Sequence, residues 1–229
     1  MSSATPAPAP MSWRRTSRGP RDLTWWVAMA FMVGASLFAL GSFPPFAQLM
    51  EPAVVAGVFF AGSIPFTSAA AGQLLLAILG ERSSPPGRRI VGHGWAWWAA
   101  AIQFPGTIFF NVSTFDALLD GLSTTQINRL VWAPDIFGST AFLLASAAGW
   151  IDVCGFRWVR RDDEAWWGAA LNALGSVLFG LAGLASLVLP TTGEVVNLAL
   201  VNAGTFGGAV CFFLVAYLLL PPAPRTAPA

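Results

Sequence analysis

Long uncharged stretches follow one another along almost the whole chain. Five windows between charged residues or His93 contain 22 to 30 residues without a charge, and a sixth, between Asp135 and Asp152, contains 16. A membrane-spanning helix needs about 20 mostly apolar residues, so the sixth window is long enough only if one of its flanking carboxylates lies in a terminal turn. The pattern predicts six membrane-spanning helices, at 24–42, 53–79, 95–114, 133–152, 166–189 and 196–219.

The composition agrees with a membrane protein. Of the 229 residues, 55% are hydrophobic and 10% are charged, whereas an ordinary soluble domain carries about a quarter charged residues. Helices exposed to water also keep a polar face opposite their apolar stripe, and these segments have none. Two cysteines exclude a disulfide-stapled scaffold. We therefore expect an all-α membrane protein whose main partner is the lipid bilayer.

Arginine sets the predicted orientation. The chain has no lysine, and eleven of its twelve arginines fall before the first helix, between helices two and three, between helices four and five, or after helix six. Only Arg129 falls on the opposite side. Because positive charge favours the cytoplasmic side, both termini are predicted to be cytoplasmic. Residues 1–22 are rich in Ala, Pro, Ser and Arg and are predicted to form a disordered tail, and 221–229 form a second cytoplasmic tail.

The odd-numbered helices share a sequence pattern. In each, two adjacent tryptophans are followed by a glycine eight positions after the second tryptophan, and by a phenylalanine four positions after the glycine. The three copies begin at Trp25, Trp97 and Trp166. The copies are offset by 72 and 69 residues. The tryptophan pair lies at the predicted cytoplasmic start of each odd-numbered helix, so the pairs fit an interfacial belt.

The even-numbered helices repeat as well. Gly-Ser-x-x-Phe begins at Gly62 and at Gly138, and a looser copy begins at Gly208, with Ala209 in place of serine. The repeating unit is thus a two-helix hairpin. An even number of spans per unit gives every copy the same orientation, so the repeats are parallel rather than inverted. The predicted units are 23–80, 93–153 and 165–220.

These motifs resemble a known family. The paired tryptophans, the central glycine and the Gly-Ser-x-x-Phe helix are similar to the YrhK-like membrane domain, most clearly over residues 59–73, 100–118 and 131–146. The resemblance implies a multi-pass protein of the bacterial cytoplasmic (inner) membrane. It implies no enzymatic activity.

Polar residues gather on one face of the third predicted helix. Steps of four, four and three residues place them within an arc of about 80°, at Gln103, Thr107, Asn111 and Thr114. Asn172 and Ser176 occupy the matching face of the fifth helix. One interpretation is helix packing, in which each interhelical hydrogen bond contributes roughly 0.6–2 kcal/mol. The other is a polar site or pathway on the axis between the three hairpins.

Asp135 completes the candidate polar site. It follows Pro134, which is typical of the first residue of a helix, and the helix dipole favours a carboxylate in the first turn. The alternative is a half-buried acid at the outer mouth of a pathway, with Arg129 as its partner.

Chemistry-bearing motifs are missing from the sequence. One histidine and two separated cysteines do not make a zinc or haem ligand set. Phosphate-binding loops, nucleophile elbows and the zinc-protease motif are absent. The net charge of +1 gives no reason to expect nucleic-acid binding. No catalytic residue, metal or cofactor is therefore predicted.

Three function hypotheses remain open. The leading one is a non-enzymatic membrane protein with a structural, sensory or assembly role, acting as a homo-oligomer or with a membrane partner. The alternative is a small-solute channel or carrier that uses the polar stripe of the third helix. A membrane enzyme with Asp135 or Asp116 as an acid or base is the third.

Overall fold

The structure of the protein is a computed structural model that describes residues 22–82, 94–157 and 163–220. The predicted tails lie outside these ranges, apart from Asp22. So do His93 and most of the arginines on which the predicted orientation depends.

The described residues form six long helices, three short helical segments and one isolated β-bridge. The predicted all-α class is confirmed. In chain order the elements are α1 (Leu23–Ser42), α2 (Pro44–Leu49), α3 (Pro52–Arg82), α4 (Trp95–Asp116), α5 (Thr124–Ile127), the π-helix η2 (Asn128–Trp132), α6 (Ala133–Cys154), α7 (Glu164–Ala185) and α8 (Leu198–Leu218).

Five of the long helices are long and apolar enough to cross a membrane. They comprise α1, α3, the continuous helix Thr124–Cys154, α7 and α8. The sixth long helix, α4, has 22 residues, as many as α7, but its hydropathy is lower. Three tryptophans near its start and the four polar residues of the predicted stripe account for that difference.

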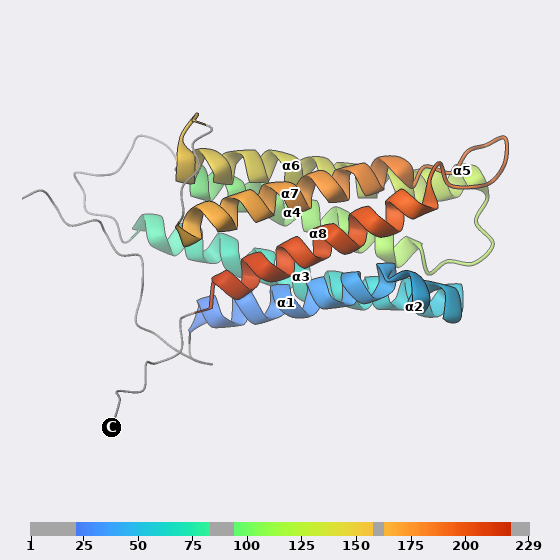
Figure 1. The fold of residues 1–229 in the computed structure, drawn as a ribbon, viewed down its shortest axis with the longest axis horizontal. Coiled ribbons are helices and arrows are strands. Elements are labelled where there is room, and N and C mark those ends of the chain that lie inside the picture. Colours follow the sequence, from blue (N-terminus) through green and yellow to red (C-terminus); the bar gives the residue numbers. More distant parts are fainter. Residues whose placement is uncertain (1–21, 83–93, 158–162, 221–229) are drawn as a thin grey trace, which may run out of the picture.

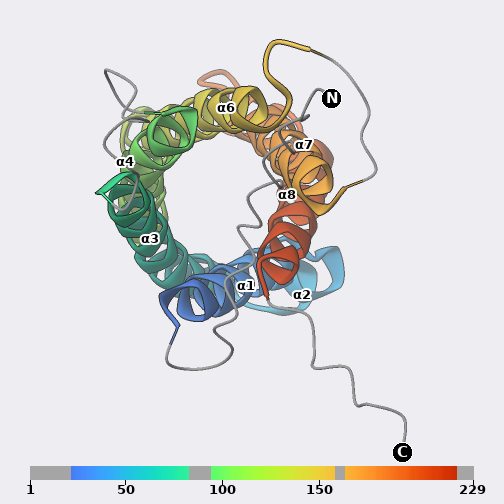
Figure 2. The same ribbon diagram turned by 90° about the vertical axis from the view of Figure 1, so that its left-hand side faces the viewer.

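The six long helices form a closed ring (Figure 2). Each packs against the next in chain order, and α8 packs against α1 to complete the circle. The most extensive contacts join α1 to α3, α4 to α6, and α7 to α8. Along the bundle, α2, α5 and the loop between α7 and α8 lie at one end, while α1 begins and α8 ends at the other (Figure 1).

Acidic and amide side chains fix several helix starts. Asp22 accepts a hydrogen bond from the backbone N–H of Thr24 at 3.1 Å, and Asp163 accepts one from that of Trp166 at 2.8 Å. Both satisfy N–H groups that a helix leaves free in its first turn. At the start of α4 the capping oxygen comes from another helix, because Asp152 of α6 accepts a hydrogen bond from the N–H of Ala96 at 3.1 Å.

The fourth long helix, α6, begins at Ala133 as predicted, but an unpredicted helical segment precedes it without a break. Helix α6 is continuous with η2 and α5, so the continuous helix begins at Thr124, where Ser123 and Gln126 form a capping box. Pro134 therefore lies inside a helix. Proline has no N–H to donate to the carbonyl of Leu130, and the wider π turn lies where that hydrogen bond is lost.

The fifth predicted helix, α7, ends at Ala185 rather than at the predicted 189. Beyond it the chain forms a tight loop closed by a bridge between Val188 and Val195. Asn128 of η2 holds this loop: its Nδ2 donates to the carbonyl of Val188 at 2.7 Å, and its Oδ1 accepts from the N–H of Val188 at 3.0 Å. This long-range contact replaces the last predicted turn of the helix.

One phenylalanine from each long helix fills the centre of the ring. All six are at most 8% exposed. They are Phe38, Phe66, Phe110, Phe142, Phe179 and Phe212. Those of α3, α6 and α8 form a closed triangle, with ring centroids 5.9 Å apart for Phe66 and Phe142, 5.8 Å for Phe66 and Phe212, and 5.6 Å for Phe142 and Phe212.

The other three rings form a second layer. Phe179 lies 5.8 Å from Phe38 and 6.0 Å from Phe110. Each ring of this layer also contacts the phenylalanine of its paired helix, at 6.2, 5.2 and 5.4 Å for α1, α4 and α7 respectively. Aromatic pairs at such distances contribute about 0.5–1.5 kcal/mol each beyond burial. The two layers form a continuous aromatic plug across the axis.

Facing glycines bring the paired helices close together. A Cβ on Gly34 would lie 2.8 Å from the carbonyl oxygen of Gly62, which no real side chain tolerates. The α4–α6 and α7–α8 pairs have the same arrangement, with Gly106 facing Gly138 and Gly175 facing Gly208. A Cβ on Gly138 or Gly208 would lie 3.0 Å from the carbonyl oxygen of the glycine opposite. Small residues allow this approach of two backbones in membrane bundles.

Candidate functional site

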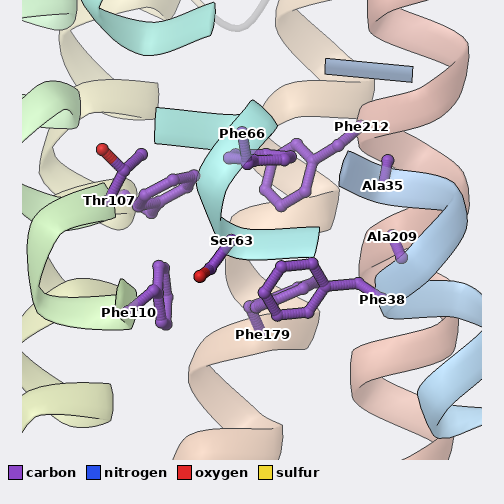
Figure 3. Close-up of a pocket in the computed structure, with 10 residues that line it drawn as sticks. Ala35, Phe38, Ser63, Phe66, Thr107, Phe110, Phe179, Ala209 and Phe212 are labelled. Atoms are coloured by element: carbon purple, nitrogen blue, oxygen red, sulfur yellow. The ribbon is translucent and has the colours of Figure 1, made fainter. Parts of the chain in front are cut away.

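A small cavity lies among the six phenylalanine rings (Figure 3). Its volume is about 10 Å³, which is room for a single water molecule at most. Ala35 and Ala209 complete its apolar wall, and two hydroxyl-bearing residues, Ser63 and Thr107, line it as well. Both hydroxyls are engaged, since Ser63 donates to the carbonyl of Phe60 at 2.8 Å and Thr107 to that of Phe104 at 2.6 Å. The cavity offers no free chemical group.

Two of the four stripe residues of α4 bond to α3. The hydroxyl of Thr67 donates to the carbonyl of Thr107 at 3.2 Å, and the hydroxyl of Thr114 lies 3.1 Å from that of Ser63. Both bonds join helices of different predicted hairpins.

The remaining stripe residues, Gln103 and Asn111, have side chains that lack partners within the described part of the chain. The side chain of Gln103 is 8% exposed and makes no hydrogen bond there. The Oδ1 of Asn111 is buried and also unpartnered.

The two predicted polar residues of α7 meet α6 instead. The hydroxyl of Ser176 lies 2.6 Å from that of Ser146, and Nδ2 of Asn172 donates to the same Ser146 hydroxyl at 3.0 Å. Ser146 also donates to the carbonyl of Asn172 at 3.3 Å. This compact network again joins two predicted hairpins. Sequence reasoning missed Ser146, because nothing local shows which serine of α6 faces α7.

Asp135 lies on α6 opposite the last turn of α7. Its Oδ2 is 2.8 Å from the position that a Cβ on Gly183 would occupy. Trp132, one turn before Asp135, donates its indole N–H to the carbonyl of Gly183 at 3.0 Å. The proposed partner Arg129 is exposed and forms no ion pair with Asp135, so that pairing is wrong.

The structure separates the seven candidate residues into three places. Thr107 and Thr114 of the α4 stripe bond to α3, Asn172 and Ser176 bond to α6, and Asp135 meets α7 nearer the end of the bundle that carries α5. Gln103 and Asn111 share the stripe with the two threonines but bond to no other helix in the described ranges. Sequence reasoning also missed Ser139, whose buried hydroxyl has no hydrogen-bond partner among the described residues.

Ligand sets for a transition metal do not come together in the described ranges. No three His, Cys, Asp or Glu side chains gather there, and Cys154 and Cys211 are free thiols.

Comparisons with known proteins add no identity. The chain matches no protein-family model, no curated protein and no solved structure.

Proposed function

We propose that this chain is a non-enzymatic, multi-pass protein of the bacterial inner membrane that acts through its scaffold, in a structural, sensory or assembly role. The observation that carries the proposal is the aromatic plug. Six buried phenylalanines close the axis of the ring, and three of the seven candidate side chains, those of Thr114, Asn172 and Ser176, bond to a neighbouring helix. The predicted YrhK-like membership is part of this proposal.

The outer surface supports a membrane location for all six long helices. Large apolar side chains cover it, as at Leu144 of α6 (57% exposed) and Leu184 of α7 (61% exposed). Helix α4 also carries them, with Phe109 (41%) and Phe115 (52%) turned outward. Lipid solvates such a surface, whereas water does not. We therefore count α4 as the sixth membrane span.

The packing supports three parallel hairpin repeats. The same glycine contact and the same phenylalanine pair occur in the α1–α3, α4–α6 and α7–α8 pairs. The hydroxyl and amide bonds of Thr114, Asn172 and Ser176 lie between successive hairpins, at the α3–α4 and α6–α7 contacts. In this arrangement, glycine and phenylalanine contacts are common to all three hairpins, and polar residues join the first hairpin to the second and the second to the third.

Solute transport is the alternative that the proposal must exclude. A channel or carrier needs a continuous polar lining, and the central cavity is closed and largely apolar. Purified protein reconstituted into vesicles loaded with a small fluorescent solute is expected to release it no faster than protein-free vesicles. Release that is faster with the wild type, and slowed by Asn111→Leu, would show that the stripe of α4 carries solute.

The predicted topology places the α7–α8 loop outside the cytoplasm. A cysteine placed at exposed Thr192, in a chain whose native cysteines are replaced, is expected to react with a membrane-impermeant maleimide added to intact spheroplasts. A cysteine at Phe156, which is 81% exposed after α6, serves as the cytoplasmic control and is expected to react only after lysis. The reverse pattern would invert the proposed orientation.

A further inference from the structure

Asp135 and Ser139 both face the inside of the ring. Asp135 stands seven residues before the central Phe142, and Ser139 stands three before it. At about 100° per residue these positions lie within about 20° and 60° of the direction of Phe142. Gly183 stands four residues after the central Phe179, which places it within about 40° of that ring on α7. The three residues thus meet on one side of the aromatic plug.

Because Gly183 has no side chain, Oδ2 of Asp135 and the hydroxyl of Ser139 can approach α7 there. The corresponding positions in the other odd helices, four residues after each phenylalanine, are Ser42 and Thr114, and both are buried hydroxyl residues. On α7 a Cβ at Gly183 would lie 2.8 Å from Oδ2 of Asp135 and 3.3 Å from the hydroxyl of Ser139. The glycine therefore admits a carboxylate and a hydroxyl side by side.

Neither oxygen has a donor among the residues that the structure describes. Ser139 is 2% exposed, and its hydroxyl finds no hydrogen-bond partner in that part of the chain. Asp135 makes no hydrogen bond or ion pair within the described ranges. An unpaired carboxylate inside a membrane span is costly, and such residues mark ion or substrate sites.

The surroundings add negative charge. The last turn of α7 lies at the negative end of the helix dipole. Its carbonyls have donors of their own, since that of Ala182 accepts from the N–H of Ser186 at 3.0 Å and that of Ala185 from the N–H of Asn197 at 3.1 Å. The carbonyl of Gly183 already accepts from the indole of Trp132 at 3.0 Å and from the hydroxyl of Ser186 at 2.9 Å. Asp135 thus lies beside a helix end that repels an anion and attracts a cation.

We infer that Asp135 and Ser139, at the last turn of α7, form a binding site for a monovalent metal cation, for which Na⁺ is the probe. A single carboxylate balances a single positive charge. The described residues gather no set of three His, Cys, Asp or Glu side chains of the kind that holds a divalent metal. Membrane transporters hold Na⁺ with the same kinds of group, side-chain oxygens and the C-terminal ends of helices. The inference rests on the proposed membrane location of α6 and α7, and it does not require transport.

The test is the Na⁺ dependence of stability. A ligand that binds only the folded state raises the melting temperature of detergent-purified protein. If 150 mM NaCl exceeds Kd about thirty-fold, Tm is expected to rise by about 4–8 °C relative to 150 mM choline chloride. Asp135→Asn is expected to lose this rise. Asp120→Asn, in the exposed loop after α4, removes the same charge and is expected to keep it.

Ser139→Ala separates binding from packing. The hydroxyl of Ser139 makes no hydrogen bond, so its removal is expected to leave Tm in choline unchanged. It is expected to raise the Na⁺ concentration for half-maximal stabilisation about ten-fold, whereas Ser68→Ala, which removes an exposed hydroxyl of α3, changes neither. If Asp135→Asn does not yield folded protein, binding of radioactive Na⁺ to the wild type and to Ser139→Ala decides.

Three outcomes would overturn the site. The wild-type Tm could be equal in Na⁺ and choline, or Asp135→Asn could retain the Na⁺ response. The protein could also be stabilised by acid without any response to Na⁺, which would identify a proton as the ligand. Labelling at Thr192→Cys examines the membrane topology separately. Correct labelling without a Na⁺ response would remove only the cation site, and incorrect labelling would remove the proposed topology.

Discussion

Replacing Phe142 by alanine is expected to lower the free energy of unfolding by about 3 kcal/mol, since truncation of a buried phenylalanine leaves a cavity that the neighbours fill only in part. Phe142 is 2% exposed and contacts the rings of Phe66, Phe110 and Phe212 at 5.2–5.9 Å. The loss is measured by titrating the purified protein with SDS and following its helicity. Phe142 is the most deeply buried of the six central rings, and it contacts rings of both aromatic layers.

Phe137→Ala is the matched control for Phe142→Ala. Phe137 lies on the same helix but is 59% exposed on the outer surface, where lipid or detergent replaces the lost ring. Its variant is expected to change the free energy of unfolding by less than about 1 kcal/mol. Equal losses in the two variants would mean that the aromatic plug does not hold the ring together.

Gly34→Ala is expected to cost about 2 kcal/mol, because one added methyl group must push two backbones apart. Its Cβ would lie 2.8 Å from the carbonyl oxygen of Gly62 and 3.0 Å from Cβ of Phe66. Neither atom belongs to the far end of a flexible side chain, so the contact cannot relax locally. The same SDS titration measures the loss.

The control for Gly34→Ala is Gly57→Ala on α3, where nothing lies within 4 Å of the new Cβ. Alanine favours a helix over glycine by roughly 1 kcal/mol, so this variant is expected to be neutral or slightly stabilising. Gly106→Ala is expected to behave like Gly34→Ala if the hairpins are repeats of one unit. A neutral Gly106→Ala would separate the second hairpin from the first.

The long helices could be predicted from the sequence because each is an uninterrupted apolar segment. Two departures from their predicted bounds have different causes. The apolar window around Asp135 ends near Ala133, whereas the helix continues through the more polar segment back to Thr124. At the other position, Asn128 binds Val188 across 60 residues of sequence. No local pattern shows such a contact.

Helical spacing predicted which residues share a face, but it could not predict what that face touches. The stripe of α4 and the pair on α7 were found from steps of three and four residues. Their partners Ser63 and Ser146 lie on other helices, at 3.1 and 2.6 Å from the hydroxyls of Thr114 and Ser176. Ser139 belongs to the repeated Gly-Ser-x-x-Phe motif, but the motif does not show that Gly183 and Asp135 lie beside its hydroxyl.

The order of helices around the ring follows the order of synthesis, and this has a consequence for assembly. Each helix that enters the membrane finds the previous one as its neighbour, so five of the six contacts can form while the chain is still being made. The contact between α1 and α8 is different. It joins α1 to α8 and forms only after α8 has entered the membrane. Until then the bundle is an open arc whose phenylalanines face lipid through the gap, and a membrane chaperone or insertase that holds α1 would act in this interval.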